Sequence, residues 1–188
     1  MNATDNALMA RVSAGEIPQL AVLFERHHRS LFRYFVSMNR DRELAQDLVQ
    51  DVFLRILRYR RTYDARQSFT AWMYQIARNA GVDQARKRPA EVVDIQDFSE
   101  RQMEPRSSES GPEELAAQGQ NLRILERALD QLADDKREIL LLARYQEMKY
   151  EDISAVLGCE VNTVKVRVYR AMRALEQIYF SLEKEKAS

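Results

Sequence analysis

Residues 150–170 read YEDISAVLGCEVNTVKVRVYR, and this stretch decides how the chain can fold. A short helical pattern, Tyr150–Leu157, ends at Gly158, where a helix commonly closes in the left-handed conformation. After a turn of Gly158-Cys159-Glu160-Val161, a second helix is expected from Asn162 to Glu183, with Asn162 as its N-cap. A short helix, a glycine-containing turn and a longer helix make a helix-turn-helix pattern.

Apolar residues at helical spacing predict the small core between these two helices. They are Ile153, Val156, Leu157, Val161, Val164, Val168, Met172 and Leu175. The remaining positions at the start of the second helix point outward and carry mostly polar or basic groups, which suit base edges and phosphates. A plain helical hairpin with a solvated basic face is the alternative. The predicted DNA-facing residues are Asn162, Thr163, Lys165, Val166, Arg167, Tyr169 and Arg170.

Outward from this stretch, the whole chain of 188 residues is predicted to be all-α, with two small helical domains joined by a flexible acidic linker. Only 5 glycines and 4 prolines interrupt the helical patterns, and three of the prolines fall in the linker. The expected boundaries are 1–88 for the first domain, 89–113 for the linker and 114–188 for the second domain. Besides the two helices above, the helices expected are Asn6–Ala14, Ile17–Ser37, Asp41–Arg60, Ser68–Lys87, Pro112–Leu132 and Asp135–Glu147.

The charges are distributed unevenly although the net charge is zero. Residues 1–88 hold 15 basic against 9 acidic residues, and residues 89–118 hold 2 against 8. A basic first block suggests a polyanionic partner, although charge alone fits an ordinary solvated surface equally well. One cysteine, Cys159, excludes an internal disulfide and a multi-cysteine zinc site. No metal, cofactor or membrane insertion is expected, and the chain is expected in the cytoplasm.

The first domain offers two candidate binding features. Polar residues on one face of the helix 41–60, among them Asp47, Gln50, Asp51 and Arg55, form either a docking face for a basic partner or a solvated, dipole-matched face. The loop after that helix and the helix 68–87 interleave aromatic, basic and amide residues, as single-strand binding surfaces do. There Trp72 is expected in the core, and Tyr63 and Arg66 in contact with a ligand.

These motifs resemble the extracytoplasmic-function (group IV) sigma factors of bacterial RNA polymerase. The stretches DLVQDVF at 47–53, FTAWMYQIARN at 69–79 and DQARKR at 83–88 look like sigma region 2. LDQL at 129–132, EILLL at 138–142, YEDISAVLG at 150–158 and NTVKVR at 162–167 look like region 4.

The resemblance implies a sigma factor that binds the polymerase core and directs initiation at promoters. Asp47, Gln50, Asp51 and Arg55 would then meet the clamp helices of the β′ subunit, region 4 would meet the β flap and the minus-thirty-five duplex, and the linker would enter the RNA path. An anti-sigma protein is a further expected partner. The residues expected at the melted minus-ten element are Tyr63, Arg66, Ser68, Phe69, Asn79, Asp83 and Arg86.

Two departures concern the recognition helix, where Val166 and Tyr169 stand in place of the small polar residue and the histidine common in the family. A free-standing helix-turn-helix regulator remains the alternative function, but it gives no reason for the acidic face at Asp47 and Asp51. An enzyme is not expected, because the sequence shows no phosphate-binding glycine loop, no metal ligand set and no nucleophile–base pair.

Overall fold

The computed structural model describes residues 3–87 and 112–187, and within these ranges every regular element is a helix or a single helical turn. The predicted linker falls almost wholly outside the described residues. Because the described residues form helices and helical turns, the all-α class is confirmed. The elements are α1 (Asp5–Ser13), α2 (Gln19–Asn39), α3 (Arg42–Tyr59), a 3₁₀ turn η1 (Arg60–Thr62), α4 (Phe69–Lys87), α5 (Pro112–Gln131), α6 (Asp134–Leu140), a π turn η2 (Leu141–Tyr145), α7 (Tyr150–Leu157) and α8 (Val161–Ala187).

Local signals explain most of these boundaries. The carboxylate of Asp41 accepts a hydrogen bond from the Leu44 amide at 2.9 Å and caps α3, as its position predicted. Gly158 closes α7 with φ of 62°. Two expectations were wrong: the helix predicted to run to Glu147 changes to the π turn after Leu140, and α8 begins at Val161, which places Asn162 inside the first turn.

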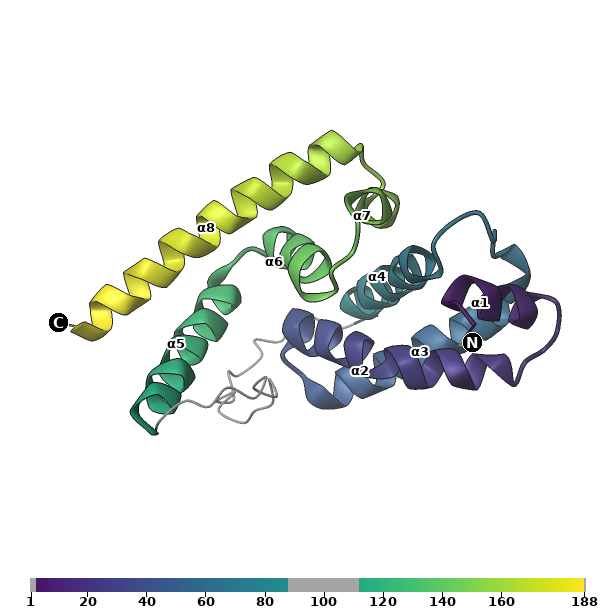
Figure 1. Cartoon of the computed structure of the whole chain (residues 1–188), viewed down its shortest axis with the longest axis horizontal. Helices are drawn as coiled ribbons and strands as arrows, with labels where there is room; N and C mark the ends of the chain where they lie inside the picture. Colours follow the sequence, from purple (N-terminus) through teal and green to yellow (C-terminus); the bar gives the residue numbers. More distant parts are fainter. Residues whose placement is uncertain (1–2, 88–111, 188) are drawn as a thin grey trace.

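Helices α1 to α4 form one group of packed helices (Figure 1). In the apolar core between them Phe35, Ile56 and Met73 are almost completely buried. Trp72 is 8% exposed, which confirms its predicted core position. Helices α5 to α8 form the second group, in which α5 and α8 lie side by side and α7 packs on α8. No helix in the described ranges is long and apolar enough to cross a membrane.

One buried charge in the second group has a structural role. The Arg137 side chain is only 6% exposed, and its guanidinium donates to the backbone carbonyls of Leu129, Asp130 and Leu132 at 2.7–2.9 Å. These carbonyls lie at the end of α5, where a helix runs short of intrahelical donors. The Leu132 amide also donates to the Leu129 carbonyl at 3.2 Å, and Arg40 also donates to the Asp130 carbonyl. Arg137 therefore joins the end of α5 to the start of α6.

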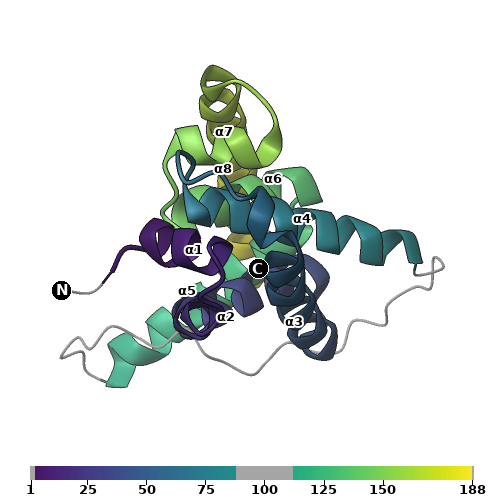
Figure 2. The same cartoon turned by 90° about the vertical axis from the view of Figure 1, so that its right-hand side faces the viewer.

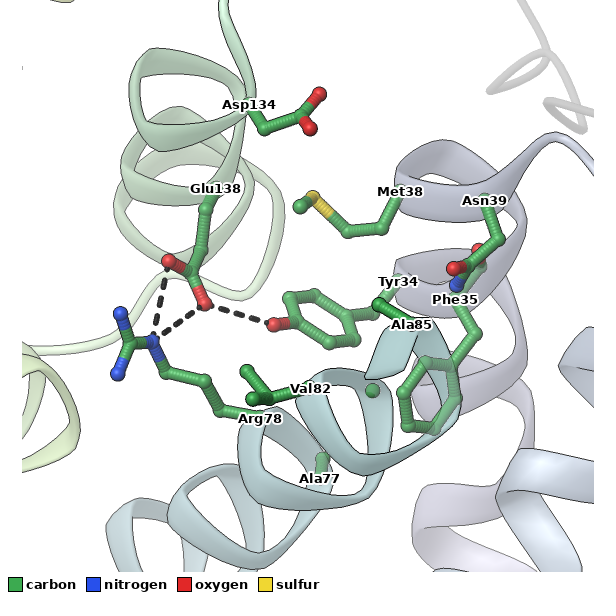
Figure 3. Close-up of a pocket in the computed structure, with 11 residues that line it drawn as sticks. Tyr34, Phe35, Met38, Asn39, Ala77, Arg78, Val82, Ala85, Asp134 and Glu138 are labelled. Atoms are coloured by element: carbon green, nitrogen blue, oxygen red, sulfur yellow. Dashed lines mark hydrogen bonds and ion pairs between the residues drawn. The ribbon is translucent and has the colours of Figure 1, made fainter. Parts of the chain in front are cut away.

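The two helical groups are in contact. α4 packs against α7, and α2 touches α6 (Figure 2). The buried residues of both groups form one continuous cluster. Polar contacts reinforce this packing: Gln75 donates to the backbone carbonyl of Ala155 at 2.8 Å, and Arg40 pairs with Asp130 at 3.2 Å. A pocket between α2, α4 and α6 holds the carboxylate of Glu138 between Tyr34 and Arg78 (Figure 3).

Candidate nucleic-acid and protein interfaces

The polar face of α3 is open to solvent. Asp47 and Gln50 are exposed, and Asp51 is partly exposed. Leu54 continues this face, one turn after Gln50, with 65% of its surface exposed. This face therefore presents carboxylates and one apolar side chain to solvent. The sequence analysis missed Leu54, although its spacing of three and four from Asp51 and Gln50 places it on the same face.

Arg55 connects this face to α4. Its Nε donates to Asp51 at 2.9 Å and its Nη1 to Asp83 at 2.8 Å. The hydrogen bond from Arg55 lowers the pKa of Asp83, which stays ionised as the partner of that guanidinium. The guanidinium of Arg55 thus links Asp51 of the predicted polymerase-docking face to Asp83 of the predicted minus-ten site.

The 63–68 loop joins η1 to α4, and the aromatic residues at its start and directly after its end are buried. Tyr63 is 8% exposed and Phe69 is fully buried, so neither ring presents an open face to a base in this structure, and the ligand contact expected of Tyr63 stays a prediction. The reason for the burial is packing, since the Tyr63 ring lies 5.1 Å from that of Trp72. The Tyr63 hydroxyl donates to the Gln67 carbonyl at 3.1 Å.

The rest of the loop is accessible. The Arg66 side chain is 92% exposed and forms an ion pair with Asp64 at 2.6 Å. The side-chain hydrogen bond from Arg66 lowers the pKa of Asp64 to about 2. Ser68, which is partly exposed, uses its hydroxyl to accept a hydrogen bond from the Ala71 amide at 3.3 Å in the first turn of α4.

Helix α4 carries the remaining minus-ten candidates on one face. Asn79, Asp83 and Arg86 follow one another at spacings of four and three, which aligns them along the helix. Asn79 and Arg86 are exposed, and Asp83 is occupied by Arg55. The structure thus brings these three residues together and leaves two of them open to a ligand.

The predicted helix-turn-helix core is confirmed in part, because Leu157, Val161 and Leu175 are only partly buried and Met172 is exposed. Ile153, Val164 and Val168 are at most 4% exposed, but Met172 is 38% exposed and Ala171 is fully buried in its place. The spacing from Val164 explains this, because Ala171 follows it by seven residues, close to two full turns, and stays on the buried face, whereas Met172 follows it by eight and falls at the edge of that face.

The opposite face of α8 is exposed over its first three turns. Of the seven residues predicted there, only Thr163 is partly buried. Val166 and Tyr169 are 49% and 66% exposed, which is unusual for an apolar and an aromatic side chain placed together. Arg173, which follows on the same face, pairs with Glu176 at 2.8 Å.

Comparison with known proteins shows to which family the chain belongs. The model of Sigma-70 region 2 matches residues 23–90, and that of Sigma-70 region 4 matches residues 122–175. The ECF RNA polymerase sigma factor EcfG of Rhodopseudomonas palustris is 30% identical over 151 residues, which cover 80% of this chain and 80% of that protein. The chain belongs to the ECF family of RNA polymerase sigma factors. The resemblance seen in the motifs is thereby confirmed, and a free-standing regulator is not favoured.

Further relatives of this sigma factor cover nearly its whole length. The ECF RNA polymerase sigma-E factor of Escherichia coli is 28% identical over 189 residues, covering 92% of this chain and 93% of that protein. Among solved structures, the sigma factor RpoE of Bartonella quintana in complex with the anti-sigma factor NepR is similar with a TM-score of 0.67 and 25% identity. That similarity covers 84% of this chain and 94% of the other. In this sigma factor, region 2 thus corresponds to α2–α4 and the region 4 helix-turn-helix to α7 and α8.

Proposed function

We propose that this sigma factor docks on the β′ clamp helices of RNA polymerase through Asp47, Gln50, Asp51 and Leu54. The exposed polar side chains suit a basic partner, and the exposed leucine adds apolar area next to them. Arg55 acts from behind this surface, where it orients Asp51 and Asp83 rather than contacting the polymerase.

The minus-ten element is read, in this proposal, by the exposed part of the 63–68 loop and by α4. Arg66 is the loop side chain with the greatest reach, and Asn79 and Arg86 extend the surface along α4. Ser68 caps α4, while Tyr63 and Phe69 hold the loop from inside. These roles suit a melted strand, in which splayed bases meet polar groups and cations at the protein surface.

The minus-thirty-five element is read by α8. Lys165, Arg167 and Arg170 present donors for guanines or phosphates, and Asn162 suits an adenine. Val166 and Tyr169 add apolar surface suited to thymine methyl groups. The observation that carries the proposal is that six of the seven predicted residues stay exposed on a helix whose other face is buried in the helix-turn-helix core.

The remaining partners follow from the family. Region 4 meets the β flap, and residues 89–113 enter the RNA path of the polymerase. The sigma factor works in the cytoplasm by binding, without catalysing a reaction itself, and the domain boundaries lie near residues 88 and 114. A protein of the anti-sigma kind, like the NepR bound to the Bartonella quintana relative, holds it inactive.

Run-off transcription with purified core polymerase on a library of genomic fragments tests this proposal. Wild-type protein is expected to initiate at a defined set of promoters, whereas Asp47→Lys with Gln50→Lys is expected to lose core binding and remain folded. Glu25→Lys, an exposed charge reversal on α2, is the matched control. Initiation no better than with core polymerase alone would refute the function, and core binding retained by the double variant would refute the docking face.

A further inference from the structure

The side chain of Asn6, in the first turn of α1, bridges two backbone groups that lie more than sixty residues away. Its Nδ2 donates to the Gln67 carbonyl at 3.1 Å, and its Oδ1 accepts from the Phe69 amide at 2.9 Å. The Phe69 amide is one of the donors that the start of a helix leaves without an intrahelical acceptor. Asn6 therefore caps α4 from outside and holds the end of the 63–68 loop at the same time.

Neighbouring contacts keep Asn6 in place. Asp5 pairs with Arg26 of α2 at 2.6 Å and with His27 at 2.7 Å. The His27 ring meets the Phe69 ring edge to face, with 5.4 Å between centroids. Leu8, Met9 and Val12 of α1 are buried in the core, so α1 is a firm support for the amide.

The loop is also held at its first residue, because the Tyr63 hydroxyl donates to the same Gln67 carbonyl that accepts from Asn6. Between these attachments Ala65 and Arg66 are exposed. A loop that contacts DNA bases benefits from fixed ends and an exposed centre. If the loop became ordered only on binding, the loss of conformational entropy would weaken the binding.

We propose that Asn6 is a positioning residue for minus-ten recognition. α1 lies before residue 23, where the match to region 2 begins, so this role belongs to a part of the chain outside that match. The inference rests on the proposed function of the 63–68 loop. Without the amide, the loop would sample more conformations, of which fewer would suit the correct base.

The test uses the full-length protein, core polymerase and a promoter recovered by run-off transcription with the wild type. Each minus-ten base is replaced in turn, and open-complex formation is compared with that on the original promoter. Asn6→Ala is expected to lower this discrimination about fivefold at one or more minus-ten positions, the equivalent of roughly 1 kcal/mol. Discrimination at the minus-thirty-five element is expected to stay unchanged.

Thr4→Ala is the matched control. The Thr4 hydroxyl accepts a hydrogen bond from the Ala7 amide and caps α1, but makes no hydrogen bond to the loop. Removing this hydroxyl therefore weakens α1, the helix that also carries Asn6. Hydrogen exchange at residues 66–69 is expected to accelerate in Asn6→Ala and not in Thr4→Ala. An equal loss of discrimination in both variants would show a general effect on stability and would overturn the inference, as would unchanged exchange in Asn6→Ala.

Arg66→Ala separates this inference from the proposed function. If Arg66→Ala lowers minus-ten discrimination but Asn6→Ala does not, the loop reads DNA and Asn6 has no part in it. If neither the wild type nor any variant discriminates between minus-ten bases, the proposed function of the loop is refuted, and the role of Asn6 with it.

Discussion

The phenolic oxygen of Tyr34 lies 3.0 Å from Oε1 of Glu138, a residue 104 positions further along the chain. Both side chains are buried, and Nε of Arg78 donates to the same carboxylate at 3.1 and 3.3 Å. Since Tyr34 and Arg78 belong to region 2 and Glu138 to region 4, this carboxylate joins the two parts of the sigma factor (Figure 3).

Breaking this contact is expected to weaken the packing between the two regions. Tyr34→Phe should lower the free energy of unfolding by about 1 kcal/mol, because one hydrogen bond is lost while Arg78 still pairs with Glu138. Glu138→Ala should cost about 3 kcal/mol, because it leaves the buried Tyr34 hydroxyl without an acceptor. Urea denaturation measures both, and an increased radius in small-angle scattering would show the regions separating. Equal stability of Glu138→Ala and the wild type would contradict this.

Alkaline pH is expected to destabilise the folded chain. Burial raises the pKa of Tyr63 to about 12 and raises the pKa of Tyr34 well above its ordinary value, which the carboxylate of Glu138 raises further. The folded state therefore holds these protons more tightly than the unfolded state, and stability should fall as the pH rises above about 10.

Thermal unfolding between pH 8 and 11.5 checks this dependence on pH. The double variant Tyr34→Phe with Tyr63→Phe is expected to show a shallower decline above pH 10. A decline as steep as that of the wild type would show that other groups are responsible.

Gly158→Ala is expected to destabilise the protein by about 1 kcal/mol. Gly158 has φ of 62°, and a Cβ there would meet nothing within 4 Å, so the cost is conformational strain and not a clash. Gly119→Ala is the matched control: it lies within α5, again with nothing within 4 Å, and should stabilise by up to about 1 kcal/mol. Chemical denaturation measures the free energy of unfolding of both variants and shows whether the first is lowered and the second raised.

Arg137→Met is expected to cost about 3 kcal/mol. Methionine keeps much of the volume of the side chain but removes all the hydrogen bonds of the buried guanidinium, among them the one to the carbonyl of Leu132 just after α5. Arg127→Met, an exposed position on the same helix α5, should change stability by less than about 0.5 kcal/mol. Similar losses in the two variants, measured by urea denaturation, would be inconsistent with the capping role.

Arg167→Ala is expected to weaken promoter discrimination by about 1–3 kcal/mol at one minus-thirty-five position if its partner is a guanine. The exposed side chain makes no contact on which the fold depends, so stability should be unchanged. Competition binding of holoenzyme to promoters with single base replacements measures the effect. Wild-type preference at every minus-thirty-five position would disprove a base contact.

Periodicity was enough to predict most of the helices, the turn at Gly158 and the outward face of α8, because these depend on neighbours within a few residues. Asp41 as a cap and Trp72 as a core residue follow from the same local information. Local patterns also led to the family, since the motifs of both regions are short and continuous.

Packing between distant segments decided the rest. Tyr63 lies in a loop, but its ring is buried against Trp72, and Arg55 of the predicted docking face also pairs with Asp83 of α4. The hydrogen bonds of Asn6 to the 63–68 loop and of Tyr34 to Glu138 join segments 61 to 104 residues apart. The spacing of residues within one helix cannot predict these contacts, because they depend on how whole helices pack against one another.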